Sequence, residues 1–340
     1  MGGSTVPYAL RQNKFVDRRI YIDLLSRVER YFTVDDHVYI SMGGATLEDH
    51  RLAHAELGMN RLLSFDSETW VVARQRFNKP YDYIKVIQST STDLISNFSH
   101  TLEENGFGAA PNVAMWLDFT SPGEIGQQVR EFNQLLDLLQ PHDILRITVN
   151  ASASAIYRPE KVDGRAERED EFKPKRLKKL QERLGDYLPT DAAPDDMVDS
   201  NLGKVLAQSL EKAAKEAFPA SSKLIAVPLS LVRYADGQQM LSATTVILDR
   251  GEVDAFLEKT KAKAWPFYSA TWTDIHLISV PEFTMRERML IGSKVSGASE
   301  GDICTELGFL FNNDKGDAEE YIRQYKRYYR FYPHFHHIVV

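Results

Sequence analysis

Cysteine is almost absent from this sequence: Cys304 is the single one among 340 residues. A disulfide needs two cysteines, so the chain cannot form an internal one, and this composition is typical of a reducing compartment. No apolar run reaches the length of a membrane-spanning helix, and the first residues lack the apolar core of a signal peptide. We therefore expect a cytoplasmic protein that has no membrane segment.

Several common signatures of enzyme chemistry are also missing. The sequence contains no serine-nucleophile elbow, no P-loop and no zinc cluster. His334, His336 and His337 stand together but lack a matching set of ligands elsewhere, so we predict no metal site. The net charge of −7 argues against a surface that is basic throughout, although it leaves room for a local basic face.

What is present begins with an apolar run at residues 38–41, which stops at Met42, Gly43 and Gly44. This pattern is typical of a strand that ends in a tight turn, because glycine adopts turn conformations freely. We expect a helix to begin next at Thr46, whose hydroxyl can cap free backbone amides, with an acid three residues later.

A second predicted strand, residues 61–65, is followed by Asp66 and Ser67. Glycine in the first turn lets the backbone approach a ligand closely, and an acid about 20 residues further on can accept ribose hydroxyls. The spacing of Gly43 and Gly44 from Asp66 therefore predicts the first half of a nucleotide-binding βαβ unit.

Three further strands are predicted at residues 83–87, 113–117 and 143–149, each separated from the next by a helical pattern. Strands that alternate with helices imply a doubly wound parallel sheet. Ligands of such sheets bind outside the carboxyl ends of the strands, which is where Asp118 and Thr120 follow the fourth one.

Two strand-like runs later in the chain, residues 223–232 and 240–248, are joined through Asp236 and Gly237. An Asp-Gly pair between such runs is a strong signal for a hairpin. The predicted fold is thus α/β, a mainly parallel sheet that ends in an antiparallel hairpin. Nicotinamide-binding domains usually keep their last strand parallel, so this feature disfavours them.

The segment from Asp66 to Arg76 has an acid at a strand end, a short polar turn and a helix that carries Ala-Arg. It resembles the second motif of class I S-adenosylmethionine (SAM)-dependent methyltransferases, and the resemblance covers roughly residues 34–250. It implies a Rossmann-like fold, SAM as cofactor and Asp66 on the ribose. It also implies an adenine contact near Ser89 and Thr90.

In that family the acceptor lies near the end of the fourth strand, so the resemblance makes Asp118 and Thr120 the candidate catalytic residues. Asp118 would orient a polar acceptor and take its proton, and it would also border the cofactor. The alternative is that Asp118 only ties its loop to a helix start at Ser121. For Ser89 and Thr90 the alternative is a turn whose neighbours, Ser91 among them, cap the next helix.

The chain departs from the family at the first motif, where an acid and several glycines are usual and residues 40–45 have Ile-Ser-Met-Gly-Gly-Ala. This departure keeps a second function class open: a methyltransferase-like subunit for ligand binding or assembly that has lost catalysis. A nicotinamide-dependent oxidoreductase is a third.

We expect three parts: an N-terminal helical extension (1–33), a methyltransferase-like domain (34–250, with a charged helical insertion at about 155–220) and a C-terminal α+β extension (251–340). In the first part, a helix from Val16 has an apolar face. Its arginines lie outside that face and are expected in solvent; they are Arg18, Arg19, Arg27 and Arg30.

Two segments, 173–183 and 321–330, are locally basic. The first is expected to be a solvated helix of mixed charge, and the second a helix that packs its tyrosines on a domain. Both leave nucleic acid open as a partner, since basic and aromatic side chains together can bind phosphates and stack on bases. The acceptor, and any oligomer or protein complex, are not specified by the sequence.

Overall fold

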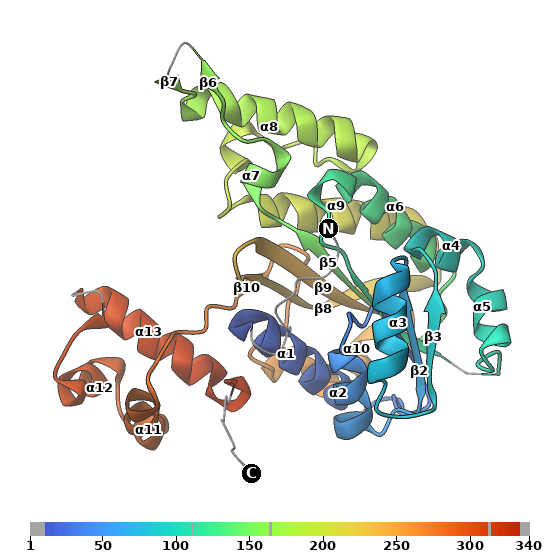
Figure 1. Cartoon of the computed structure of the whole chain (residues 1–340), viewed down its shortest axis with the longest axis horizontal. Helices are drawn as coiled ribbons and strands as arrows, with labels where there is room; N and C mark the ends of the chain where they lie inside the picture. The colour runs from blue at the N-terminus through green and yellow to red at the C-terminus, as the bar shows by residue number, and fades with distance from the viewer. Residues whose placement is uncertain (1–10, 110–111, 163–164, 312–313, 334–340) are drawn as a thin grey trace.

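The computed structural model describes residues 11–109, 112–162, 165–311 and 314–333. Its main sheet has eight strands in the order β10-β8-β9-β5-β4-β1-β2-β3 (Figure 1). These strands are β1 (Val38–Ser41), β2 (Arg61–Asp66), β3 (Ile84–Gln88), β4 (Val113–Asp118), β5 (Ile144–Asn150), β8 (Leu224–Ala235), β9 (Gln239–Asp249) and β10 (Ile275–Leu277). A separate small hairpin joins β6 (Lys161–Val162) to β7 (Arg165–Ala166).

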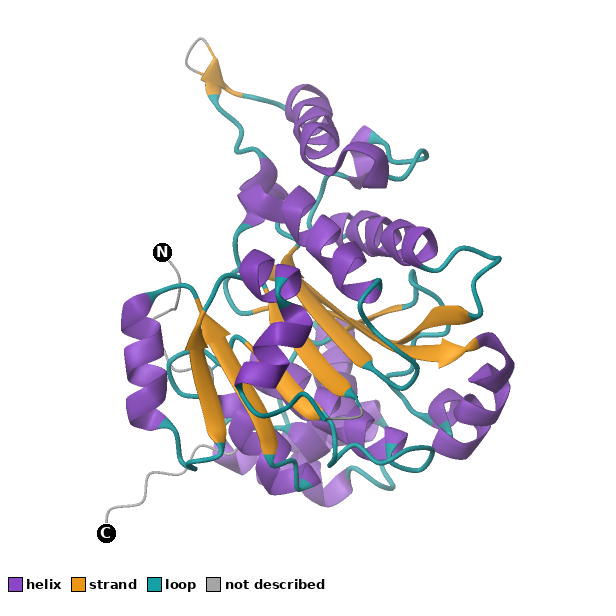
Figure 2. Cartoon of the chain, turned by 90° about the vertical axis from the view of Figure 1, so that its right-hand side faces the viewer, coloured by secondary structure: helices purple, strands orange, loops and turns teal. Residues whose placement is uncertain are grey.

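Helices cover both faces of this sheet, and further helices extend beyond it (Figure 2). They are α1 (Gln12–Val28), α2 (Glu48–Leu57), α3 (Thr69–Asn78), α4 (Ser91–Ser96), α5 (Phe98–Glu104), α6 (Ile125–Leu136), α7 (Ala153–Ile156), α8 (Glu169–Leu184), α9 (Leu202–Ala217), α10 (Val253–Thr260), α11 (Met285–Lys294), α12 (Glu300–Leu307) and α13 (Lys315–Tyr328).

Side chains of each strand alternate between two apolar cores, as the pleat of a strand requires. In β4, Met115 and Leu117 face the core that contains α4, α6 and α9, whereas Ala114 and Trp116 face the core that contains α1, α2 and α10. The central strands are buried on both sides, which explains their nearly continuous apolar sequences.

The predicted fold class is confirmed. Strands β1 to β5 pair in parallel, and β8 and β9 form the expected antiparallel hairpin through Asp236 and Gly237, whose φ of +97° suits glycine. The second strand of the hairpin, β9, lies between β5 and β8 and is antiparallel to both.

Two helix starts differ from the sequence-based expectation. Helix α2 begins at Glu48, and the Thr46 cap is wrong: Leu47 occupies the cap position in a left-handed conformation, and its N–H donates to the Gly43 carbonyl at 3.0 Å. Leu47 is fully buried, so packing of this residue fixes the entry to the helix. At Ser121 the side chain makes no capping bond, and a short 3₁₀ turn, Pro122–Glu124, precedes α6.

Helix α1 begins at Gln12, about one turn before the expected start, because the hairpin caps it from outside. The carboxylate of Asp236 accepts the backbone N–H groups of Asn13 and Lys14 at 3.2 and 2.8 Å. An acid at this place satisfies helix donors that have no partner within the helix. In Figure 1, α1 lies between α2 and the C-terminal helices.

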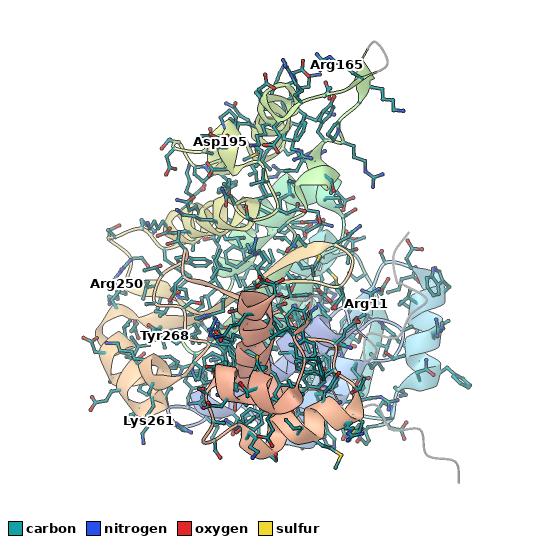
Figure 3. All side chains as sticks on the ribbon, turned by 90° about the vertical axis from the view of Figure 1, so that its left-hand side faces the viewer. Arg11, Arg165, Asp195, Arg250, Lys261 and Tyr268 are labelled. Atoms are coloured by element: carbon teal, nitrogen blue, oxygen red, sulfur yellow. The ribbon has the colours of Figure 1, made fainter. Side chains whose placement is uncertain are left out.

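The regions outside the sheet are an arm and a helical end. The arm contains β6, β7 and α8 and projects from the sheet, with Arg165 at its tip and Asp195 on its side (Figure 3). After residue 250 the chain forms α10, adds β10 to the sheet in parallel to β8, and then forms α11 to α13. The three-part division of the chain stays a prediction.

Within the described residues, no helix is both long and apolar enough to span a membrane. His334, His336 and His337, which were considered as a metal site, lie outside the described residues.

Candidate active site

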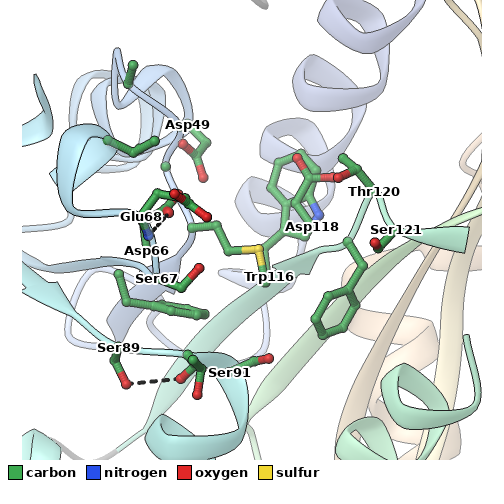
Figure 4. A pocket seen from close by; sticks show the side chains of 18 of the residues that line it. Asp49, Asp66, Ser67, Glu68, Ser89, Ser91, Trp116, Asp118, Thr120 and Ser121 are labelled. Atoms are coloured by element: carbon green, nitrogen blue, oxygen red, sulfur yellow. Dashed lines mark hydrogen bonds between the residues drawn. The ribbon is translucent and has the colours of Figure 1, made fainter. Parts of the chain in front are cut away.

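A cavity of about 660 Å³ opens at the carboxyl ends of β1, β2, β3 and β4. Figure 4 shows Asp49 and Asp66 on one side of it and Asp118 and Thr120 on the other. Every candidate site residue from the sequence lines this cavity: Met42, Gly43, Gly44, Asp66, Ser67, Ser89, Thr90, Asp118 and Thr120. The topology thus brings four separate turns into one place, and the role of each residue stays a proposal.

The glycine turn after β1 is closely packed. Gly43 and Gly44 both have positive φ angles, and a Cβ on Gly43 would lie 2.5 Å from the Ser64 Oγ. The N–H groups of the turn are used internally, since that of Gly43 donates to the Ser41 Oγ at 3.2 Å and that of Gly44 to the Met42 carbonyl at 2.7 Å. Gly43 is therefore required for packing, Gly44 suits its positive φ, and the amides of both are used within the turn.

Side chains of α3 hold the same turn from the other side. The Gln75 amide donates to the Met42 carbonyl at 2.8 Å, and the Asn78 amide donates to the Ala45 carbonyl at 2.8 Å. Gln75 is fully buried, so its amide has a fixed position. These two bonds hold the turn that borders the cavity beside β1.

Asp66 ends β2 and stands half-buried at the cavity. Its Oδ1 accepts the N–H of Glu68 at 2.9 Å, and its carbonyl accepts the N–H of Ser89 at 3.1 Å, which joins the turns after β2 and β3. Burial raises the pKa of the Asp66 carboxyl; the N–H of Glu68 opposes this effect and the charge of the Glu68 carboxylate adds to it. A carboxylate in this position can accept hydrogen bonds from vicinal hydroxyls such as those of a ribose.

The polar turn after β3 caps helix α4, which confirms the capping hypothesis for this turn. The Thr90 hydroxyl accepts the N–H of Asp93 at 3.0 Å, so the cap lies one residue before the expected Ser91. Ser89 and Thr90 nevertheless line the cavity, and capping does not exclude a ligand contact.

Asp118 is bound to a residue that the sequence did not suggest. The buried Lys14 ammonium of α1 donates to its Oδ1 at 2.7 Å and stands 4.7 Å from the centre of the Trp116 ring. Burial lowers the pKa of Lys14, and Asp118 and Asp17 oppose that effect. The Asp118 side chain remains 20% exposed toward the cavity, so it ties β4 to α1 without being enclosed.

Arg18 and Asp49 are lining residues that were missed. Arg18 was expected in solvent, and this expectation was wrong: the residue is 3% exposed, because this face of α1 packs beside Trp116 of the central strand β4. Asp49 of α2 is 5% exposed and accepts hydrogen bonds from the hydroxyls of Ser41 and Tyr39. Both side chains bring charge into the cavity wall.

Another charged pair, which lies outside the cavity lining, ties α1 to the sheet. Asp17 and Arg146 of β5 form an ion pair in which both side chains are 0% exposed. The Arg146 guanidinium also donates to the Thr244 hydroxyl at 2.6 Å and stacks over the rings of Tyr21 and Trp116. Buried charges are tolerated when they are paired and hydrogen-bonded, and here the two charges pair with each other, although the buried Nε of Arg146 makes no hydrogen bond within the described residues.

The sequence does contain a signal for the burial of Lys14 and Asp17. Lys14, Asp17 and Tyr21 continue, at helical spacing, the stripe formed by Leu24 and Val28. A face that is apolar in one half and charged in the other indicates packing against a polar site. No group of three or more potential metal ligands occurs among the residues that the structure describes.

Comparisons with known proteins give the family. The sequence matches, over residues 6–340, the family described as "Putative O-methyltransferase". No curated protein matches the chain.

Three solved structures illustrate its structural similarities. LepI in complex with SAM has 12% identity and a TM-score of 0.36, with 66% of this chain and 46% of LepI covered, so the chain spans about half the length of LepI. The N-methyltransferase NodS from Bradyrhizobium japonicum has 11% identity, a TM-score of 0.36 and coverages of 69% and 97%. An O-methyltransferase from Bacillus cereus in complex with SAH has 11% identity, a TM-score of 0.37 and coverages of 72% and 84%.

These TM-scores are low, so the assignment depends on the family match, which extends over nearly the whole chain. The protein belongs to this O-methyltransferase family, and its predicted relationship to the class I methyltransferases is confirmed.

Proposed function

We propose that the protein transfers a methyl group from SAM to an oxygen atom of an acceptor, and that the cavity above β1 to β4 binds the cofactor. The observation that supports this most is the joint placement of Asp66, the glycine turn and Asp118 around one cavity in a chain of an O-methyltransferase family. When bound, SAM supplies a methyl group that is activated by its sulfonium charge.

The cavity fits such a cofactor in size and in the order of its polar groups. Its volume lies within the range of roughly 300–1,000 Å³ that is usual for small-molecule sites. Neighbouring strands are about 4.8 Å apart, so the row β3, β2, β1, β4 spans about 14 Å. This length suits a nucleoside with an extended substituent.

Along this row we assign the residues in the order in which the ligand would meet them. Ser89 and Thr90 after β3 border the adenine, Asp66 and Ser67 after β2 bind the ribose, and Met42 with the glycine turn after β1 supports the rest. Asp118 after β4 stands at the end where the transferable methyl group would point.

For the acceptor, Asp118 and Thr120 are placed to orient a hydroxyl group. Methyl transfer in line needs a fixed attack geometry and removal of the acceptor's proton. Lys14 holds the Asp118 carboxylate in place. The exposed part of that carboxylate can accept the acceptor's proton as the new oxygen–carbon bond forms. Thr120 offers a hydroxyl at the exposed rim of the cavity.

Several residues of the basic segments have internal partners, which makes nucleic acid the less favoured acceptor class. In segment 173–183, Lys173 pairs with Glu169, and Arg176 is buried against the Met197 carbonyl. In segment 321–330, Tyr325 and Tyr328 pack in the core. Proteins, nucleic acids and small molecules all remain acceptor classes for the test, and Cys304 as the single cysteine supports a cytoplasmic setting.

The test is a transfer assay with SAM labelled in its methyl group. The purified chain is incubated with separated fractions of protein, nucleic acid and small molecules, with Asp118→Asn as the matched variant. We expect label in one fraction with the wild type and loss of that label with Asp118→Asn, which keeps the shape of the side chain and removes its charge. Transfer at the wild-type rate by Asp118→Asn would overturn the role of Asp118.

The same assay separates the alternatives. Binding of SAM with no transfer to any fraction would favour a subunit that has lost catalysis. A nicotinamide-dependent oxidoreductase is disfavoured because β9 is antiparallel to both of its neighbours. If Asp118→Asn did not fold, Asp118 would be a structural tie to Lys14 instead.

A further inference from the structure

Two buried charges of opposite sign line the cavity beside the glycine turn. Arg18 comes from α1 and Asp49 from α2, and each has at least nine-tenths of its surface buried. The other charged residues in the described lining are half-buried or exposed. The cavity wall therefore carries one buried positive and one buried negative group, which are complementary to a ligand that has both a carboxylate and an ammonium group.

Asp49 is held as an ionised group. Although burial alone would raise its pKa, the neighbouring His50, the Arg18 guanidinium and the Ser41 hydroxyl together hold the pKa of Asp49 below its usual range. Bonds from the Ser41 and Tyr39 hydroxyls fix the carboxylate, and Figure 4 shows it beside the cavity. At neutral pH it therefore presents a negative charge that suits an ammonium group.

Arg18 supplies the positive charge that a carboxylate would need. The amides of Gly43 and Gly44 are occupied within their own turn, so these two amides do not offer an anion site. The guanidinium of Arg18 lies 5.9 Å from the centre of the Trp116 ring, which helps to fix its plane. Arg74, the other cation in the described lining, is exposed.

The position of the pair in the sheet identifies which part of a ligand it would meet. β1 lies between β2, which carries Asp66, and β4, which carries Asp118. A group bound above β1 therefore branches from the ligand between its ribose and its transferable group. In SAM that branch is an α-amino acid, with one ammonium and one carboxylate.

We propose that Arg18 and Asp49 form the subsite for the α-amino-acid end of the cofactor, with Arg18 on the carboxylate and Asp49 on the ammonium. This inference rests on the proposed function. Asp49 would supply from α2 the acid that residues 40–45 lack, which accounts for a first motif with few glycines and no acid.

The test compares two ligands that differ only in this branch. S-adenosylhomocysteine (SAH) carries the amino acid, and 5′-methylthioadenosine has a methyl group in its place. Calorimetry is run with the wild type, Arg18→Gln, Asp49→Asn and, as the matched control, Arg19→Gln, whose side chain pairs with Glu56 away from the cavity.

We expect Arg18→Gln and Asp49→Asn each to weaken SAH binding about 10- to 100-fold, the range for a lost charge-assisted hydrogen bond. Their affinity for 5′-methylthioadenosine should stay within about threefold of wild type, and Arg19→Gln should bind both ligands normally. Equal weakening of both ligands, or unchanged SAH binding, would overturn the subsite.

A further measurement needs no variant, in case these changes impair folding. Decarboxylated SAM keeps the ammonium and lacks the carboxylate, so the wild type should bind it about 10- to 100-fold more weakly than SAM. Equal affinity would overturn the role of Arg18. Failure of the wild type to bind any adenosyl ligand would instead contradict the proposed function.

Discussion

Helices α1 and α8 are both rich in charge, and the sequence suggested solvent for the arginines of α1 and for the charges of α8. In α1, Lys14, Asp17 and Arg18 are buried, and each takes part in an interaction with the sheet or the cavity. In α8, Lys178 and Lys179 are exposed. The difference lies in what each helix covers, since α1 lies over strand ends that carry polar groups and α8 belongs to the projecting arm.

The ion pairs of the two helices differ accordingly. Those of the arm, such as Arg165 with Glu171 and Lys173 with Glu169, form between neighbours in sequence at the surface. Surface pairs contribute little because water and salt screen them. The pairs of α1 join elements far apart in the chain, so they can position a helix relative to a site.

The largest expected effect comes from breaking the buried pair of α1. Asp17→Asn leaves the Arg146 guanidinium buried without its counter-charge, and we expect a loss of about 3–5 kcal/mol in the free energy of unfolding. Urea denaturation measures it. The matched change in the arm, Glu171→Gln, should leave the midpoint nearly unchanged; equal losses in both variants would remove the distinction between the helices.

A smaller loss is expected at the cavity rim. Lys14→Met leaves Asp118 beside Trp116 without its ammonium partner, and we expect about 2–3 kcal/mol because Asp118 is partly exposed. The double variant Lys14→Met with Asp118→Asn should regain part of this stability, since no unpaired charge remains. A double variant as unstable as the sum of both single changes would show that the pair is not coupled.

The comparison extends to ligand binding. Asp66→Ala should weaken SAM binding by about 1.5–3 kcal/mol, the scale of a charge-assisted hydrogen bond to the ribose. Lys178→Gln and Lys179→Gln in the arm should leave the affinity unchanged, because these side chains are remote from the cavity lining. Wild-type affinity in Asp66→Ala would make the ribose assignment wrong.

The pH dependence of cofactor binding gives the smallest effect. Burial raises the pKa of Asp66, and ribose binding needs the ionised form, so affinity should fall about tenfold per pH unit below that raised pKa. A raised folded-state pKa stabilises the protein at low pH and loses that contribution as pH rises, so Asp66 itself does not drive acid unfolding. Asp66→Asn should bind weakly with a flat profile in calorimetry; a wild-type pH profile in that variant would assign the titration elsewhere.

The sheet and most of the cavity could be predicted from the sequence because their signals are local. Gly43 and Gly44 mark a turn, Asp66 follows an apolar run, and Asp236-Gly237 marks a hairpin, so each residue is defined by its immediate neighbours. Parallel topology then brings the strand ends together, and the nine candidate residues line one cavity as a result.

The residues that escaped prediction depend on tertiary packing. Arg18 and Lys14 become site residues only because α1 docks over β4, and that docking is fixed by Asp236 and Arg146, which lie more than 100 positions away. Asp49 has the sequence signature of an ordinary helix start. The Thr46 cap failed for the same kind of reason, since burial of Leu47 decides how α2 begins.

The central claim is that this cavity binds an adenosyl cofactor for methyl transfer. Calorimetry with SAM, SAH and NAD against the purified full chain tests it most directly. The account predicts binding of SAM and SAH with a stoichiometry of about one per chain and no binding of NAD. Binding of NAD without SAM or SAH would contradict it.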